Sequence, residues 1–153
     1  MPVAKMFPTK IFIDQRRGSL ALNAQLLREI EDLAELDEGG IKWSRKNYLN
    51  GFTSYGSANE LHKTSSTFAG LKEWIDSRVL RYAKDLDLDL GRGKLEMSNC
   101  WANVMFEHSQ HSWHIHPLAV ISGTYYVSLP EGSPAIKFED PRLPFFMHTP
   151  PRK

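Results

Sequence analysis

Histidines are concentrated in the stretch Trp101 to Arg142, which holds four of the six histidines in this sequence. Two of them, His114 and His116, form an H-x-H pair that is followed by Pro117. Side chains two residues apart on a β-strand project to the same side, so both imidazoles can reach one metal ion. Imidazole binds zinc, copper, iron and nickel, so two histidines alone do not select the metal. The sequence therefore predicts a metal site at His114 and His116.

The residues around the pair limit what a bound metal could do. A zinc hydrolase needs a general base beside the metal. Glu107 is the nearest upstream carboxylate, but its spacing does not place it there. A cupin motif would need a glycine six residues before the first histidine, where His108 stands, and a glutamate where Val120 or Ile121 stands. A structural or surface role for the two histidines is the alternative to a metal site.

Segments typical of strands lie on both sides of the histidine pair. Leu95, Met97 and the run Cys100 to Phe106 precede it, while Val120 to Leu129 and Ala135 to Phe138 follow it. These segments are rich in the β-branched and aromatic residues that favour strands. Nearby aromatic side chains could keep the site poor in water; they are Trp101, Trp113, Tyr125 and Tyr126. We therefore expect the site at the end of a sheet.

The N-terminal part has the periodicity of helices. Apolar residues recur every three or four positions in Ala21–Leu36 and in Phe68–Leu86. We expect Gly39-Gly40 to end the first helix and Ser66 or Thr67 to cap the second. Helices followed by strands indicate an α+β fold.

Two further segments are less regular. Met6–Ile13 predicts a short opening strand. Ile41–Ser66 alternates aromatic with small polar residues, which favours a long loop fixed to the body by its aromatic side chains. The alternative is that this segment lines a substrate site, because long loops often carry binding roles.

Composition excludes several classes of protein. With 153 residues, 41% apolar and 24% charged, the chain is long enough for a single globular domain. A net charge of +1 gives no strong field, so we expect neither a nucleic-acid nor a membrane partner. The single cysteine, Cys100, excludes an internal disulfide and fits a reducing compartment, so we expect a cytoplasmic protein. The sequence does not indicate the oligomeric state.

Three motifs together resemble a known family. H-x-H-P at 114–117, S-G-x-Y-Y-V at 122–127 and F-x-D-P-R at 138–142 are similar to a group of bacterial and phage proteins. That group belongs to the iron(II)- and 2-oxoglutarate-dependent oxygenases, and the opening M-F-P-T-K-I-F at 6–12 resembles its opening too. The resemblance implies a double-stranded β-helix (jelly roll) preceded by and packed with the two main helices. Residues 1–153 would form one domain, with 1–93 as helical support and 94–153 as the first part of the jelly-roll core.

The resemblance also assigns roles to individual residues. His114 would be the first Fe(II) ligand, and His116 takes the place that the wider superfamily usually gives to Asp or Glu. Asn103, eleven residues before His114, matches an asparagine that bonds 2-oxoglutarate in AlkB-like relatives; its alternative role is that of a sheet or turn amide. Tyr126 resembles the tyrosine that contacts 2-oxoglutarate in prolyl-hydroxylase-like enzymes. Ser122 should share its face of the strand and is a weaker candidate.

The superfamily's third metal ligand is a histidine on a later strand, followed by an arginine or lysine that pairs with 2-oxoglutarate. Lys153 comes before that point. We therefore expect the last strands, the third ligand and the basic anchor to lie outside this sequence. His148 is a possible substitute ligand, but it stands in a proline-rich stretch better suited to a loop.

The activity that the resemblance implies is that of a non-haem Fe(II)- and 2-oxoglutarate-dependent dioxygenase. Such an enzyme converts 2-oxoglutarate to succinate and carbon dioxide while it hydroxylates a substrate, here an unknown small molecule or protein side chain. The alternative from another class is a metal-binding jelly-roll protein without oxygenase activity, such as a sensor or a binding module. A zinc-dependent hydrolase ranks third.

Overall fold

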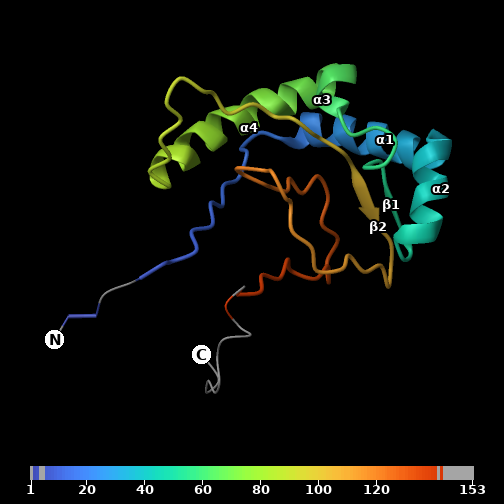
Figure 1. The fold of residues 1–153 in the computed structure, drawn as a ribbon. Helices are drawn as coiled ribbons and strands as arrows, with labels where there is room; N and C mark the ends of the chain where they lie inside the picture. Colours follow the sequence, from blue (N-terminus) through green and yellow to red (C-terminus); the bar gives the residue numbers. More distant parts are fainter. Residues whose placement is uncertain (1, 4–5, 141, 143–153) are drawn as a thin grey trace.

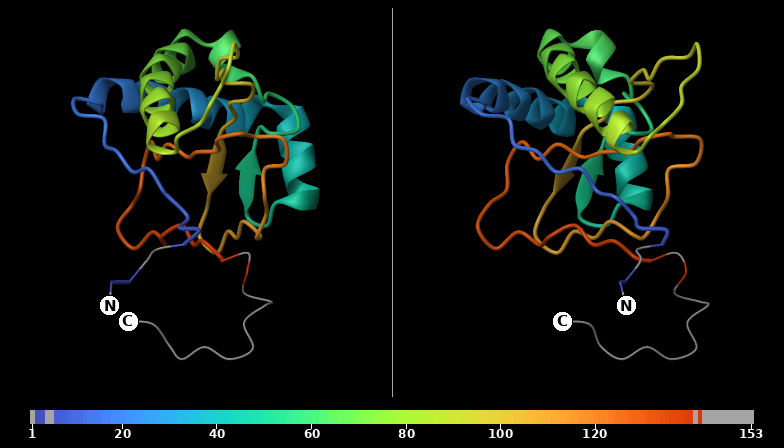
Figure 2. Two further views of the ribbon diagram at one scale, coloured as in Figure 1. Left: turned by 60° about the vertical axis from the view of Figure 1, so that its left-hand side comes forward. Right: turned by 90° about the vertical axis from the view of Figure 1, so that its left-hand side faces the viewer.

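The computed structural model describes residues 2–3, 6–140 and 142, and its helices form a layer above a two-stranded sheet (Figure 1). In chain order the elements are α1 Leu20–Leu36, α2 Glu38–Asn47, β1 Gly51–Thr53, α3 Leu61–Thr64, α4 Ser66–Asp85 and β2 Asn103–Met105. The segment after β2 passes the end of the sheet, rises to the helix layer and turns back (Figures 1 and 2). No helix of the described residues has both the length and the apolarity to cross a bilayer.

The two predicted helices are confirmed as α1 and α4. Both bury the apolar stripe that their periodicity predicted, and the core cluster consists of Leu26, Ile30, Leu61, Phe68, Leu71 and Ala102. The cap of α4 is Ser65, one residue before the predicted caps, whose hydroxyl accepts hydrogen bonds from the backbone N–H groups of Thr67 and Phe68. The same hydroxyl donates to the carboxylate of Glu29 and so joins α4 to α1.

The prediction of a long loop after Gly39-Gly40 is wrong, because α2 begins there. The Asp37 carboxylate accepts a 2.9 Å hydrogen bond from the Gly40 N–H and caps the new helix. A Cβ on Gly40 would lie 2.9 Å from the Phe52 ring and closer still to the Asp37 carboxylate. Gly40, one of the two glycines that sequence reasoning takes as a stop, thus permits close packing of α2 on β1. The short elements β1 and α3 also lie within the predicted loop.

The sheet joins residues from both halves of the chain. Strands β1 and β2 pair antiparallel, with Phe52 opposite Val104 and Thr53 opposite Asn103. Beyond them, the Ser54 N–H donates to the Ala102 carbonyl over 3.0 Å, and Ala102 N–H donates to the Ser54 hydroxyl. Strand β2 confirms the predicted strand Cys100–Phe106 over its central residues.

Other predicted strands have no regular secondary structure. Residues 6–13, 120–129 and 135–138, together with Leu95 and Met97, lie outside helices and strands. A strand requires a neighbour that takes up its backbone N–H and C=O groups. Among the described residues, no backbone hydrogen bond joins 6–13, 120–129 or 135–138 to a neighbouring strand. β-propensity alone cannot supply that neighbour, and the jelly roll stays a prediction.

Side-chain contacts nevertheless hold residues 120–129 against the helices. The Asn23 amide of α1 donates to the Val127 carbonyl over 3.1 Å, and the Tyr125 hydroxyl donates to the Asn23 side-chain oxygen over 2.6 Å. The Tyr125 ring meets Trp74 of α4 edge-on, with ring centroids 6.0 Å apart. This docking carries the residues after the histidine pair back to the core.

Candidate metal site

His114 and His116 converge, as the H-x-H spacing predicts. Their Nε2 atoms lie 3.2 Å apart, although the backbone around them is not a strand. The Nδ1 atom of His114 lies 2.9 Å from the carbonyl oxygen of Ser112. A carbonyl can only accept, so Nδ1 carries the proton in this contact, and the lone pair of a neutral ring is then on Nε2. A backbone carbonyl on the second ring nitrogen is the usual support of a metal-binding histidine.

The distance between the two nitrogens tests whether one metal ion fits. Two nitrogen ligands about 2.1 Å from one metal and at right angles lie about 3 Å apart. The observed 3.2 Å agrees with this separation. Imidazole nitrogens suit Fe(II) as well as zinc and copper. The pair therefore fits as two ligands of a metal ion.

A third ligand is not found in the described part of the chain, where no group of three or more His, Cys, Asp or Glu residues could hold a metal ion. His111 lies close, but its ring stacks on His114 with centroids 4.3 Å apart, so it presents a face and not a lone pair. Glu107 pairs at 3.5 Å with His108, and both side chains are exposed. His148 lies outside the described residues. A carboxylate base of the kind a zinc hydrolase needs is therefore not seen beside the pair in residues 6–140.

Aromatic side chains connect the histidines to the helical half. The His111 ring meets Tyr48, at the end of α2, with centroids 5.0 Å apart. The ring centroids of Trp101 and His116 lie 5.8 Å apart, and those of Tyr55 and Trp101 lie 5.1 Å apart. Burial lowers the pKa of His111, and the nearby His114 and His116 lower it further. Two aromatic residues of Ile41–Ser66 thus take part in this chain of ring contacts, and a substrate-lining role for the segment stays a prediction.

Sequence reasoning anticipated Trp101 beside the pair but missed Tyr48. The sequence gives no signal for Tyr48, because only the fold brings it to the histidines. His111 is exposed and stacks behind His114.

The three predicted 2-oxoglutarate contacts are exposed side chains. Asn103 is an exposed residue of β2, and Ser122 and Tyr126 are exposed in the segment after the histidines. In the described chain, no hydrogen bond or ring contact joins any of the three to His114 or His116. Tyr126 is 46% exposed, while Tyr125 packs against the core. Their role toward 2-oxoglutarate stays a prediction.

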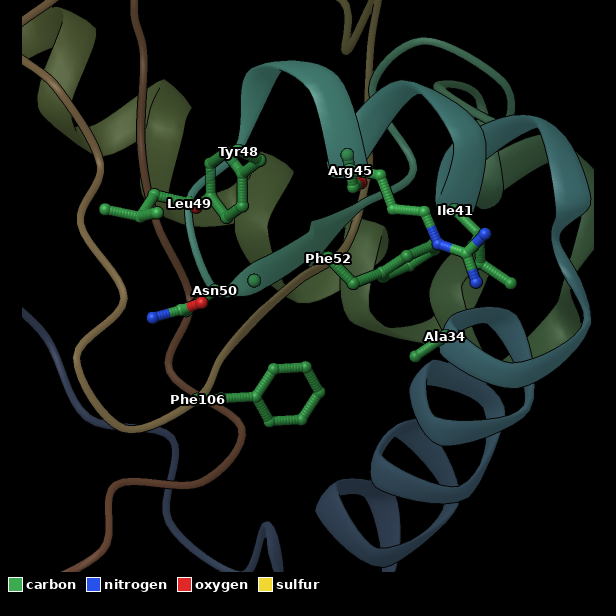
Figure 3. Close-up of a pocket in the computed structure, with 10 residues that line it drawn as sticks. Ala34, Ile41, Arg45, Tyr48, Leu49, Asn50, Phe52 and Phe106 are labelled. Atoms are coloured by element: carbon green, nitrogen blue, oxygen red, sulfur yellow. The ribbon is translucent and has the colours of Figure 1, made fainter.

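Two hollows lie beside the histidines. One cavity of about 430 Å³ is bounded by α2, β1 and Phe106 (Figure 3). A smaller one of about 290 Å³ is lined by Asn47, Tyr48, Leu49, Gln110, His111 and Ser112. Tyr48 and Leu49 line both, so the two hollows are neighbours.

Comparison with known families supports the resemblance that the motifs indicate. Residues 99–153 match the family described as "Putative 2OG-Fe(II) oxygenase". The matched segment begins just before β2 and contains His114, His116 and all three predicted 2-oxoglutarate contacts. The resemblance to the Fe(II)- and 2-oxoglutarate-dependent oxygenases is thus confirmed over this segment. Comparison of the chain with curated proteins gives no match.

Proposed function

We propose that this chain acts as a non-haem Fe(II)- and 2-oxoglutarate-dependent dioxygenase, with His114 and His116 as two of its iron ligands. The observation that carries the proposal is the 3.2 Å approach of their Nε2 atoms within residues 99–153, the segment that matches the oxygenase family. The substrate would be a small molecule or a protein side chain, and we expect no nucleic-acid or membrane partner.

The residues around the pair would prepare it for the metal. The Ser112 carbonyl keeps the proton of His114 on Nδ1, which directs the Nε2 lone pair toward His116. Stacking by His111 and the contact of Trp101 with His116 restrict both rings, which are exposed to solvent. Fe(II) held by the two histidines would activate dioxygen, with one oxygen atom passing to the substrate and the other to succinate as 2-oxoglutarate loses carbon dioxide.

A neutral His116 in place of a carboxylate leaves one negative charge fewer at the site. Because 2-oxoglutarate is an anion, this difference favours its approach to the metal. Asn103, Ser122 and Tyr126 are the residues we propose for its remaining contacts.

One observation favours a second candidate, a metal-binding jelly-roll protein without oxygenase activity. Only two metal ligands converge among residues 6–140, and no hydrogen bond or ring contact there joins the three proposed co-substrate contacts to them. Such a protein would bind a metal through His114 and His116 and would act as a sensor or a binding module. The two candidates differ in whether 2-oxoglutarate binds to the loaded site.

The test is an anaerobic titration of the protein with Fe(II) and then with 2-oxoglutarate, followed by the visible charge-transfer band of the chelate. We expect the band in the wild type and its loss in His114→Ala and in His116→Ala. His108→Ala is the matched control, because His108 is an exposed histidine that contacts neither ligand.

Each other outcome decides between the candidates. A metal that binds through the pair without any 2-oxoglutarate band supports the second candidate. Metal binding that survives both alanine variants would overturn the site itself.

A further inference from the structure

The larger cavity beside the histidines has the walls of a ligand site. Its volume of about 430 Å³ falls within the range of small-molecule clefts. Phe52 is buried in the middle of its wall, while Phe106 lies across the opening and is 58% exposed (Figure 3). Ala34 and Ile41 complete an apolar lining. A large aromatic side chain that stays exposed at the edge of a cavity is available to contact a bound molecule.

Arg45 is the one cationic residue of this lining. Its side chain extends along the edge of the cavity toward Ile41 (Figure 3). Among the described residues, no carboxylate lies within ion-pair distance of its guanidinium group. A guanidinium offers two parallel donors that match a carboxylate, and it holds its charge at every physiological pH.

A second role of Arg45 must be separated from ligand binding. Arg45 stands in the last turn of α2, where a positive charge is favoured by the helix dipole. Lys46 stands in the same turn and has the same charge, but it does not line the cavity. The structure therefore contains its own control for the effect of charge on the helix.

Tyr48 connects the cavity to the surroundings of the proposed metal site. It lines the cavity, lines the neighbouring hollow and meets the His111 ring. His111 in turn stacks on His114.

We infer that this cavity binds an organic anion with an aromatic or alkyl body, whose carboxylate pairs with Arg45 while the body lies between Phe52 and Phe106. The inference rests on the proposed function only in naming this anion as the class of substrate. Binding to the cavity itself requires no metal.

The experiment therefore uses the metal-free, full chain and 4-phenylbutanoate as the probe. Binding is followed through the backbone amide signals of Asn50 and Gly51, which line the cavity. We expect saturable binding at or below about 1 mM in the wild type. The neutral 4-phenylbutanol, which has the same body, and butanoate, which lacks the ring, should each bind about tenfold more weakly or worse.

Variants separate the carboxylate contact from the helix charge. We expect Arg45→Gln to weaken 4-phenylbutanoate by about tenfold or more, with little effect on 4-phenylbutanol. Lys46→Gln should leave both affinities unchanged. Phe106→Ala should weaken both probes, and because Phe106 is exposed it should not disturb folding, which circular dichroism checks for every variant.

Three results would overturn the inference: no saturable binding of 4-phenylbutanoate, equal affinity for its alcohol, or equal losses in Arg45→Gln and Lys46→Gln. If the probe binds but the histidines take up no iron, the anion site in the cavity is supported and only the proposed enzymatic function is overturned. If the iron and 2-oxoglutarate band appears but the probe does not bind, the proposed function is supported and the anion site in the cavity is overturned.

Discussion

The protonation of single residues decides what the candidate site can bind. His114 offers a lone pair to a metal because the Ser112 carbonyl fixes the proton on its other nitrogen. Neither ligand depends on a charged partner, so the pair is ready for a cation as long as both rings are neutral. The adjacent residues Tyr125 and Tyr126 differ in their contacts. The Tyr125 hydroxyl is hydrogen-bonded to Asn23, whereas Tyr126 is exposed.

This difference gives a prediction for the two tyrosines. Tyr126→Phe should weaken the binding of 2-oxoglutarate to the Fe(II)-loaded protein and leave Fe(II) affinity nearly unchanged, because its hydroxyl is the proposed co-substrate contact. Tyr125→Phe is the control. It should leave the affinities for Fe(II) and 2-oxoglutarate unchanged, and it should lower the free energy of unfolding by about 1 kcal/mol because the hydrogen bond to Asn23 is lost. Titrations of both ligands, with urea unfolding, measure these effects. Equal losses of iron and 2-oxoglutarate in Tyr126→Phe would argue that Tyr126 only packs.

We expect His62 to make the stability of the fold depend on pH. Its side chain is 6% exposed, and neither ring nitrogen has a hydrogen-bond partner among the described residues. Burial lowers the pKa of His62 below 6.5, and the charges of Lys63 and Lys72 lower it further, against the opposing influence of Glu60 and the Met97 backbone. The unfolded chain therefore takes up a proton at His62 before the folded chain does, so stability falls as pH drops below 6.5.

The measurement is urea unfolding at about pH 7.5 and about pH 5.5. Wild type should lose stability at the lower pH, and His62→Leu should lose distinctly less. His108→Gln, which removes an exposed histidine, should behave like wild type. An unchanged pH dependence in His62→Leu would show that His62 is already protonated, or paired, in the folded protein.

At the scale of elements, two glycines in helices have opposite surroundings. Gly40 of α2 faces the Asp37 carboxylate and the Phe52 ring, whereas a Cβ on Gly70 of α4 would meet nothing within 4 Å. Alanine favours a helix over glycine by about 1 kcal/mol at either position. Only the packing differs between the two sites, so the pair isolates the contact of α2 with β1.

We therefore expect Gly40→Ala to destabilise the protein by about 1–3 kcal/mol and Gly70→Ala to stabilise it by up to about 1 kcal/mol. Thermal and urea unfolding measure both. Stabilisation by Gly40→Ala would mean that α2 does not pack on Phe52 as described.

An element could be predicted from sequence when the residues that stabilise it lie within the element itself. Helices α1 and α4 carry their signal within themselves, as apolar residues at helical spacing. Helix α2 depends on the Asp37 cap and on close packing at Gly40, which only the fold reveals. Strands depend on a partner, so β2 forms where β1 lies opposite, while residues 120–129 stay irregular despite their composition.

At the scale of the whole molecule, the candidate site lies where the two halves of the chain meet. The spacing of His114 and His116 predicts their convergence, because both belong to one short segment. Tyr48 and Arg45 could not be predicted, since they reach the site only through the pairing of β1 with β2. The histidine pair could therefore be predicted from sequence, whereas its surroundings depend on contacts between distant parts of the chain.

The two halves are also joined away from the sheet, by Asn23. We expect Asn23→Ala to cost about 1–3 kcal/mol of unfolding free energy, because it removes one bond to Val127 and one to Tyr125. Residues 120–129 should then be cleaved faster in limited proteolysis, while α1 to α4 stay protected. Asn47→Ala is the control, because it removes an exposed hydrogen bond within α2, from the Asn47 amide to the Trp43 carbonyl. It should not change the cleavage of residues 120–129. Equal cleavage in wild type and Asn23→Ala would show that the Tyr125 and Trp74 rings alone hold this segment.

The hydrogen bonds of Asn23 affect how the chain folds during its synthesis. Its two partners stand 102 and 104 residues later in the chain. While the nascent chain leaves the ribosome, α1 and α4 can pair long before Tyr125 and Val127 arrive to cover them. During that interval the face of Trp74 that Tyr125 later covers is open to water, so the unfinished chain exposes apolar surface until residues 120–129 have been made.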